Sequence, residues 1–194
     1  EPYRRQRQMC IRDREELQAV MEKDIQNARL RRVRDIFVFS CFTGLAYSDT
    51  YYLTEEHLYK ANDGKMWIKK PRQKTKVIAD IPLLEVPLQI LDKYRGQQTG
   101  GRLLPVCSNQ KVNQYLKELA TVCGINKELT YHVARYTFAT SLTLLHDVPM
   151  ASIAKMLGHT NIRQTQHYAK ATNILLSRSM QNLSEQLNLR MEIK

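Results

Sequence analysis

The chain has 194 residues, of which 43% are hydrophobic, and its 30 Lys and Arg against 19 Asp and Glu give a formal net charge of +11. This content of hydrophobic residues excludes a disordered tail and allows one sizeable core. No apolar run approaches the roughly 18 residues of a membrane span, and the opening residues are too charged for a signal peptide. The positive charge indicates a polyanionic partner, with nucleic acid as the leading candidate and an ordinary basic protein as the alternative.

The four cysteines stand at positions 10, 41, 107 and 123, without the CxxC spacing of a zinc or redox site. They predict reduced thiols, as in the cytoplasm, rather than a disulfide framework. The five histidines also lack the spacing of zinc ligands, so no metal or other cofactor is expected.

Basic residues gather in two stretches of the chain. Residues 1–34 carry ten against six acidic residues, and residues 60–76 carry seven against one. Such stretches can neutralise several phosphates of a nucleic acid, although a solvated basic hairpin would have the same composition. The backbone contacts that we expect come from Arg4, Arg5, Arg7, Lys69, Lys70, Arg72 and Lys76.

The first third of the chain is predicted to be helical. Asp13 with Glu16 matches a capping box for a helix that reaches about residue 24. A second helix spans about residues 27–42 and ends at Gly44, and a short helix follows at 48–53. The core candidates of the second helix are Leu30, Val33, Phe37, Phe39 and Cys41.

Residues 57–83 change character and predict strands. The segments 66–68 and 77–81 are strand-like, and Asn62-Asp63-Gly64 indicates a turn. Helices are then expected at about 87–95, 110–123, 132–146, 149–157, 161–169 and 173–188. The predicted fold class is therefore α+β and mainly α, with a small antiparallel sheet of two or three strands near residues 57–83.

The last predicted helix carries an apolar face. Leu176, Met180, Leu183 and Leu187 are spaced so that they share one side of it. This face could pack on the core of its own chain or on a neighbouring copy, and the sequence leaves both open.

Four residues in the second half could together carry chemistry. His132 and Arg135 are three apart at a predicted helix start, and so can face the same site. The guanidinium of Arg135 matches two phosphate oxygens, and His132 and His159 can exchange protons near neutral pH. If Tyr168 joins them, the set suggests phosphoryl transfer through a covalent phosphotyrosine.

The order and spacing of these residues resemble the catalytic half of a tyrosine recombinase of the phage integrase family. His132-x-x-Arg135, Leu157-Gly158-His159 and Tyr168 carry the resemblance over about residues 13–170. The segment Phe42 to Asp49 resembles the family's TGLRxSE box, and Lys74-Thr75 resembles its hairpin lysine. Within the family, the sequence of these motifs is similar to that of integrases of conjugative transposons of gut anaerobes.

The resemblance implies a site-specific DNA recombinase. Tyr168 would attack a DNA phosphodiester, form a 3′-phosphotyrosyl link and free a 5′-hydroxyl, and Lys74 would protonate the leaving oxygen. Arg135 and His159 would stabilise the transition state, while His132 would assist proton transfer or position the phosphate. Strand exchange would pass through a Holliday junction without ATP or metal, in the integration or excision of a mobile element.

One position departs from the family. Ala46 stands where the box has its first arginine, which implies either a substitute cation or a DNA-binding domain that no longer cuts. Arg34 is our candidate substitute, with a role in contacting the DNA backbone as its alternative. Asp49 keeps the acidic character of the box and is expected to orient a neighbouring cation.

The resemblance also implies a domain organisation and partners. Residues 1–12 are expected to link to an N-terminal core-binding domain, residues 13–170 to form the catalytic domain, and residues 171–194 to form a C-terminal helix and tail. The partner would be double-stranded DNA with specific recombination sites, bound by a tetramer on two sites and helped by DNA-bending proteins. A free catalytic domain would be monomeric, and the protein would act at the bacterial nucleoid in the cytoplasm.

Overall fold

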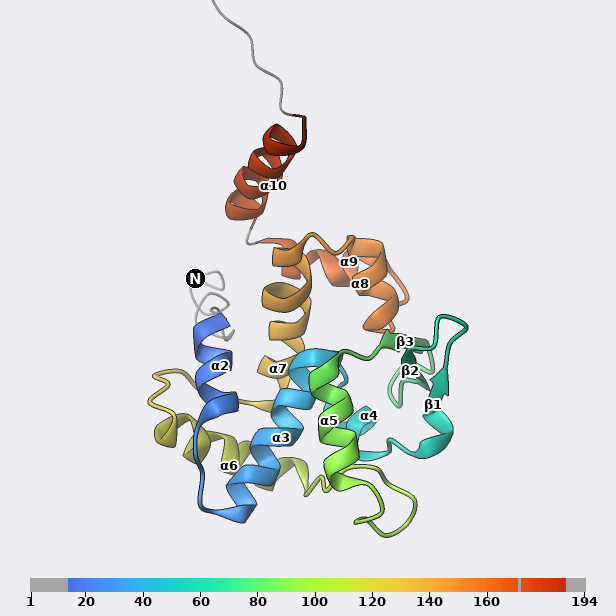
Figure 1. Ribbon diagram of the computed structural model, residues 1–194, viewed down its shortest axis with the longest axis vertical. Coiled ribbons are helices and arrows are strands. Elements are labelled where there is room, and N and C mark those ends of the chain that lie inside the picture. The colour runs from blue at the N-terminus through green and yellow to red at the C-terminus, as the bar shows by residue number, and fades with distance from the viewer. Residues whose placement is uncertain (1–13, 171, 188–194) are drawn as a thin grey trace, which may run out of the picture.

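Helix α3 (Ala28–Thr43) runs through the middle of the fold in the computed structural model, which describes residues 14–170 and 172–187 (Figure 1). The side chain of Asn27 accepts hydrogen bonds from the backbone N–H groups of Arg29 and Leu30 and so caps its start. Its residues 36–41 are all buried, because other helices cover it on several sides. The five predicted core residues of this helix are confirmed, since each is at most 6% exposed.

Four helices pack against α3. They are α2 (Arg14–Glu22), α5 (Glu85–Tyr94), α6 (Asn109–Val122) and α7 (Tyr131–Thr137). The buried carboxylate of Asp35 fixes α3 to α5, because it accepts hydrogen bonds from Lys93 Nζ at 2.6 Å and the Tyr94 hydroxyl at 2.7 Å. Burial of a carboxylate is tolerated where such partners satisfy it.

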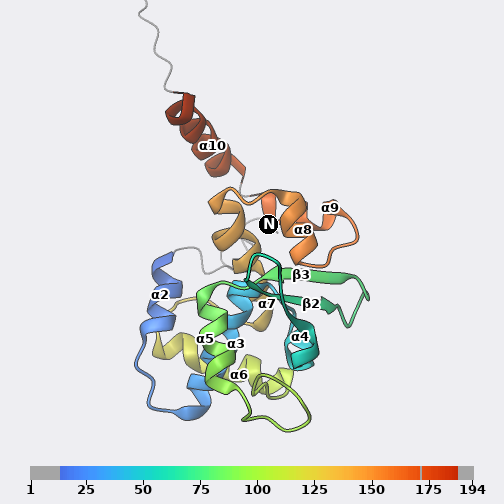
Figure 2. The ribbon, with the colours of Figure 1, turned by 45° about the vertical axis from the view of Figure 1, so that its right-hand side comes forward.

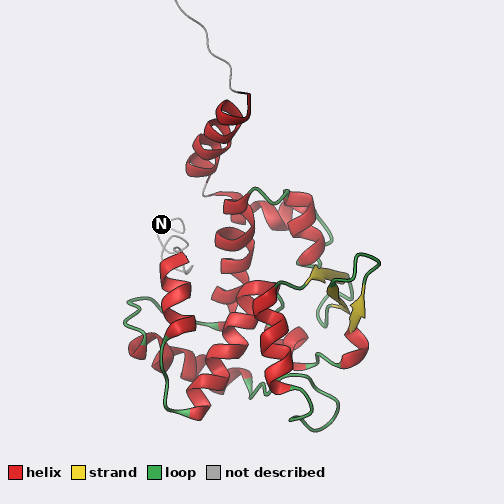
Figure 3. Cartoon of the chain, viewed as in Figure 1, coloured by secondary structure: helices red, strands yellow, loops and turns green. Residues whose placement is uncertain are grey.

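A three-stranded antiparallel sheet lies on one side of this helical body (Figure 3). Its order is β1 (Leu58–Lys60), β2 (Met66–Pro71) and β3 (Ile78–Pro82), with Ile68 opposite both Leu58 and Ile81. The predicted turn at residues 62–64 joins β1 to β2. A second turn joins β2 to β3 and is closed by hydrogen bonds between Arg72 and both Val77 and Lys76. The predicted fold class is confirmed.

The second half of the chain forms a smaller core of its own. Helices α8 (Met150–Met156) and α9 (Ile162–Gln166) and a 3₁₀ turn (Tyr168–Lys170) pack beside the end of α7, above the sheet in the rotated view (Figure 2). Its buried residues are Phe138, Ala139, Leu144, Ile153, Leu157 and Tyr168. This core places the predicted motifs around Leu157 and Tyr168 next to α7.

Two predicted helices are shorter than expected. The helix predicted at 132–146 changes after Thr137 into a π-helical segment (Phe138–Thr143) and a 3₁₀ turn (Leu144–His146). The hydroxyl of Thr143 donates to the carbonyls of Phe138 and Ala139, so threonine side chains compete for the backbone acceptors there. The helix predicted at 161–169 ends at Gln166, and Tyr168 begins the separate 3₁₀ turn.

The predicted features at the two ends have different outcomes. The predicted linker and the Asp13 cap lie outside the described residues, and the carboxylate of Glu16 accepts hydrogen bonds from Lys127 Nζ at 2.7 Å. On α10 (Thr172–Leu187), Met180, Leu183 and Leu187 are 64%, 43% and 53% exposed, so of the two alternatives left open these three do not pack on the chain's own core. Leu176 lies outside the described side chains. In the part of the chain that is described, no helix is long and apolar enough to cross a membrane.

Gly44 provides a test of how tightly α3 meets the smaller core. It has a φ of +69°, and an added Cβ would overlap Phe138 and lie 2.9 Å from Leu157 Cδ2. Gly96 has a φ of +70° with nothing within 4 Å of the same atom. We expect each Gly→Ala substitution to lower the free energy of unfolding by roughly 1–2 kcal/mol, because alanine is strained in the left-handed conformation. Gly44→Ala should lose about 1–3 kcal/mol more in free energy of unfolding because of overpacking. Urea denaturation measures both, and equal losses would contradict the close contact.

Candidate active site

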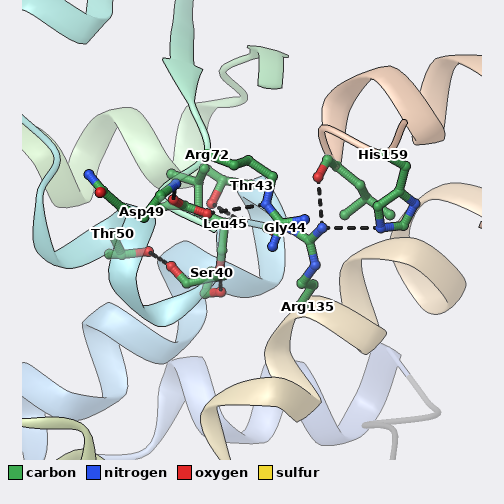
Figure 4. Close-up of polar contacts among 12 residues, drawn as sticks. Ser40, Thr43, Gly44, Leu45, Asp49, Thr50, Arg72, Arg135 and His159 are labelled. Carbon is green, nitrogen blue, oxygen red and sulfur yellow. Dashed lines mark hydrogen bonds and ion pairs between the residues drawn. The ribbon is translucent and has the colours of Figure 1, made fainter. Parts of the chain in front are cut away.

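The site is built around the buried side chain of Arg135, which is 5% exposed. One terminal nitrogen donates to the carbonyl of Gly44, at the end of α3. The other donates to the carbonyl of Leu157, at the end of α8, at 2.7 Å, and lies 3.3 Å from His159 Nε2 (Figure 4). One guanidinium therefore joins three segments that are far apart in the sequence.

Helix α7 is held at its first residue, Tyr131. The backbone N–H of Tyr131 donates to Asn113 Oδ1 on α6 at 2.8 Å, and its hydroxyl donates to Thr50 Oγ1 at 2.8 Å. The hydroxyl of Thr50 in turn donates to the carbonyl of Ala46 at 3.2 Å, at the start of α4 (Tyr47–Tyr51). These contacts clamp α7 between α4 and α6, and so set the direction in which Arg135 points.

His132 and Arg135 face the same space, as their spacing of three residues on one helix indicated. Both residues line a pocket of about 210 Å³, which Ala46 and Asn113 also line. His132 is partly open to solvent, whereas Arg135 is buried. Ala46 thus borders the space in which the two residues meet.

Arg72 is the second cation of the site. It follows β2, its side chain is 13% exposed, and its Nε lies 3.4 Å from Asp49 Oδ2. The other oxygen of Asp49 accepts a hydrogen bond from the backbone N–H of Gln73 at 2.7 Å. The expectation that Asp49 orients a cation is therefore confirmed, and that cation is Arg72, which reaches from the hairpin toward Arg135 (Figure 4).

Gly158 makes room for Arg72. A Cβ at this position would lie 2.7 Å from Arg72 Cδ, and Gly158 has a φ of +61°. The glycine between Leu157 and His159 thus lets the arginine cross beside the histidine. From the sequence Arg72 is predicted only to contact the DNA backbone, and the signal that points to the site is the cation expected beside Asp49.

Arg34 does not reach the site, which corrects our prediction of a substitute cation there. Its Nη1 donates to the carbonyl of Lys23 at 2.9 Å, and its Nε pairs with Asp35 at 3.0 Å. It lies ten residues before Gly44 on α3, which corresponds to about 15 Å along the helix axis. The buried carboxylate of Asp35 holds the guanidinium at this distant part of the helix.

Burial and, after it, the neighbouring charges shift the pKa values of the site. The pKa of Arg135 is lowered to about 10 by burial and then by Arg72, with Tyr168 and Asp49 acting in the opposite direction. The pKa of His159 is lowered to about 4 by burial, followed by Arg135 and Arg72. Burial and then Arg135 also lower the pKa of His132. At neutral pH two cations therefore face neutral imidazoles, which is an arrangement suited to an anion.

Tyr168 lies beside this cluster in the smaller core, where it is 8% exposed. Its ring is parallel to that of His159 within 2°, with centroids 6.3 Å apart, and packs edge-on against Tyr136 at 5.2 Å. His159 Nδ1 lies 2.8 Å from Thr165 Oγ1, on the segment that leads to Tyr168. The structure therefore brings Tyr168, His159 and Arg135 close together, which is the arrangement that the resemblance implied.

The other predicted basic residues divide into three groups. Lys69, Lys74 and Lys76 are exposed on the hairpin, and Lys74 lies two residues from Arg72. Lys70 is 2% exposed, so its expected contact with DNA is wrong: its Nζ donates to the carbonyl of Tyr52 and lies 3.0 Å from His57 Nε2. Its position on β2 turns it to the covered face of the sheet. The predicted contacts Arg4, Arg5 and Arg7 lie outside the described residues.

No group of His, Cys, Asp and Glu that could hold a metal ion occurs among the described residues. The chemistry that this cluster can supply is that of guanidinium groups, imidazoles and a tyrosine hydroxyl. Such groups bind an oxyanion, transfer protons and provide a nucleophile.

The depressed pKa of His159 predicts how stability depends on pH. The imidazole of His159 binds a proton near pH 6.5 in the unfolded chain but only near pH 4 in the folded site. Protonation between these values therefore lowers the free energy of unfolding. The stability that His159 contributes is thus present above about pH 6.5 and lost as the pH falls toward 4. His159→Gln should show a smaller loss of urea stability across this range than the wild type. His167→Gln, which removes an exposed imidazole, serves as the control, and identical curves for all three proteins would contradict the prediction.

Curated proteins similar to this chain are named tyrosine recombinases. One from Agathobacter rectalis is 38% identical over 76 residues, which covers 37% of this chain and 24% of that protein. Tyrosine recombinase XerC of Rickettsia canadensis is 28% identical over 156 residues, covering 73% and 48% of the two chains. The chain thus spans about half the length of this XerC relative.

Solved structures share the fold. XerH recombinase bound to its difH substrate superposes with a TM-score of 0.70 at 18% identity, covering 89% of this chain and 53% of that chain. The Tn1549 transposon integrase in complex with circular intermediate DNA has a TM-score of 0.61 at 20% identity, covering 87% and 64%. The model of the phage integrase family matches residues 12–173, and the chain therefore belongs to this family.

Proposed function

We propose that this chain is the catalytic domain of a site-specific DNA recombinase that cleaves and rejoins strands through a phosphotyrosyl link at Tyr168. The observation that carries the proposal is the convergence of two largely buried arginines, Arg135 and Arg72, beside His159 and Tyr168. Side chains from α7, the β2–β3 hairpin and the two segments after α8 meet at this point. Their chemistry fits one reaction, the transfer of a phosphoryl group to and from a hydroxyl.

The charges of the cluster favour a phosphodiester as its ligand. Two guanidinium groups repel each other where water is largely excluded, and the carboxylate of Asp49 forms an ion pair with Arg72. A phosphodiester between them would neutralise this repulsion, and its two non-bridging oxygens match the planar donors of arginine. The basic side chains exposed on the hairpin would bind the neighbouring phosphates of the same duplex.

The proposed reaction conserves the phosphodiester bond. The hydroxyl oxygen of Tyr168 bonds to phosphorus, and its proton passes to the neutral His132. The bond from phosphorus to the 5′-oxygen breaks, and Lys74 supplies the proton that this oxygen takes. A 5′-hydroxyl of the partner strand reverses these steps, so neither ATP nor a metal ion is required. Arg135, Arg72 and His159 stabilise the charge that develops on the phosphoryl oxygens.

In this proposal Arg72 replaces the box arginine, whose position in this chain is occupied by Ala46. It approaches the site from the hairpin rather than from the box, and Asp49 of that box orients it. This arrangement favours the enzyme over the alternative, a domain of the same fold that binds DNA without cutting. In the alternative the loss of the box arginine would leave Arg135 as the single arginine at the phosphate.

The proposed partner is double-stranded DNA with specific recombination sites. Among the proteins of similar fold, XerH is described bound to difH, and the Tn1549 integrase bound to circular intermediate DNA. We propose by analogy a tetramer on two DNA sites, which passes through a Holliday junction during integration or excision of a mobile element. The exposed face of α10 would pack on a neighbouring copy, residues 1–12 would lead to a DNA-binding domain, and DNA-bending proteins would assist in the cytoplasm.

Replacement of the nucleophile tests the proposal directly. The protein is incubated with negatively supercoiled plasmid, the reaction is stopped with detergent, and covalent protein–DNA adducts are counted. The wild type should form adducts that Tyr168→Phe abolishes, because the ring remains but the attacking oxygen is gone. Tyr52→Phe, which removes a hydroxyl from an exposed ring, should retain them. Absence of adducts from the wild type would instead support the alternative that does not cleave.

A second comparison tests which arginine replaces the one missing at Ala46. Arg72→Gln should slow adduct formation by about a hundred- to a thousandfold, as expected for the loss of one preorganised donor. Arg72→Lys should fall between this variant and the wild type, because it keeps the charge but loses the planar donors. Arg34→Gln is the matched control and should leave the rate unchanged. A loss at Arg34 with none at Arg72 would reverse our assignment.

A further inference from the structure

The ring of His159 is held on both sides by groups of known hydrogen-bonding capacity. On one side, Nδ1 lies 2.8 Å from Thr165 Oγ1, and Thr165 is fully buried on α9. On the other side, Nε2 lies 3.3 Å from a terminal nitrogen of Arg135. These two contacts together determine where the proton of the neutral ring resides.

The guanidinium of Arg135 can only donate hydrogen bonds. Nε2 of His159 must therefore present its lone pair to Arg135, and the proton of the neutral imidazole is on Nδ1. The Nδ1–H group then donates to Thr165 Oγ1. The opposite tautomer would set two N–H donors against each other in a partly buried space, which is unfavourable.

We propose that Thr165 is a positioning residue that holds His159 as the Nδ1–H tautomer and keeps Nε2 as the atom that gains and loses a proton. The inference rests on the proposed function, because the phosphate that Nε2 would meet is the one between Arg135 and Tyr168. The hydroxyl oxygen of Thr165 accepts the same hydrogen bond whether the ring is neutral or protonated. The ring can therefore change its charge without changing its orientation.

The protonation of Nε2 depends on whether a phosphate occupies the site. With no anion in the site, burial lowers the pKa of the imidazole, Arg135 and Arg72 lower it further, and the ring stays neutral. A phosphodiester that occupies the donors of the two arginines would favour a proton on Nε2, which would then donate to a phosphoryl oxygen. Binding of the phosphate thus turns Nε2 from an acceptor of the Arg135 hydrogen bond into a donor to the substrate.

Thr165 also lies on the segment that carries the nucleophile. It is three residues before Tyr168, whose ring is parallel to that of His159. A shift of this segment would therefore move the acceptor of the Nδ1–H group and the attacking hydroxyl together. The position of the nucleophile and the tautomer of the histidine are consequently set by one short stretch of chain.

The tautomer can be read by NMR without reference to activity. Protein labelled with ¹⁵N-histidine is recorded at neutral pH, and His159→Gln assigns the signal. In the wild type we expect a protonated Nδ1 and an unprotonated Nε2. Thr165→Val, which has nearly the same shape but no hydroxyl, should shift the ring toward the Nε2–H form, and Thr165→Ser should restore the wild-type pattern. Thr160→Val, at an exposed position next to His159, is the control.

The same variants are then compared in the plasmid adduct assay. Thr165→Val should slow adduct formation by about ten- to a hundredfold, as losses of an orienting hydrogen bond do, while DNA binding is retained. Thr165→Ser should be close to the wild type. A protonated Nε2 in the wild type would overturn the inference, and so would a Thr165→Val protein with unchanged tautomer and rate. If no protein forms adducts but the tautomers behave as expected, the proposed reaction fails while the role of Thr165 stands.

Discussion

The hydrogen bonds of the buried Arg135 guanidinium are the interaction on which the rest of this site depends. A buried guanidinium is tolerated only if its donors find acceptors, and two of its acceptors are the carbonyls of Gly44 and Leu157. These residues are the C-caps of α3 and α8, where carbonyls lack partners within the helix and the helix dipole is negative. The cation therefore satisfies two helix ends, and the helix ends fix the cation.

Two glycines make this convergence sterically possible. Gly44 lets the end of α3 approach Phe138 and Leu157, and Gly158 lets Arg72 cross beside His159. Both have a positive φ, so each also turns the chain at the end of a helix. Each of the two glycines therefore ends a helix and also leaves space for a neighbouring side chain.

The two cations of the site are anchored in different parts of the fold. Arg135 is held by the core, whereas Arg72 belongs to a hairpin that the Asp49 carboxylate ties to α4. Asp49 is 1% exposed and accepts from both the side chain of Arg72 and the backbone of Gln73. Asp49 therefore fixes both the side chain of Arg72 and the backbone of the hairpin next to it.

The sequence alone determined the order of helices and strands, the buried face of α3 and the motif set of His132, Arg135, His159 and Tyr168, because periodicity and motif spacing are local properties. The family's fold then followed from that set. Only the tertiary structure decided which cation pairs with Asp49 beside Arg135, because Arg34 and Arg72 differ in the neighbours that they meet in space and not in their local sequence. It also decided that Lys70 is buried, since the face of a strand that is covered depends on what packs against the sheet. The tautomer of His159 likewise required the structure, because it is set by Arg135 and Thr165 on opposite sides of one ring.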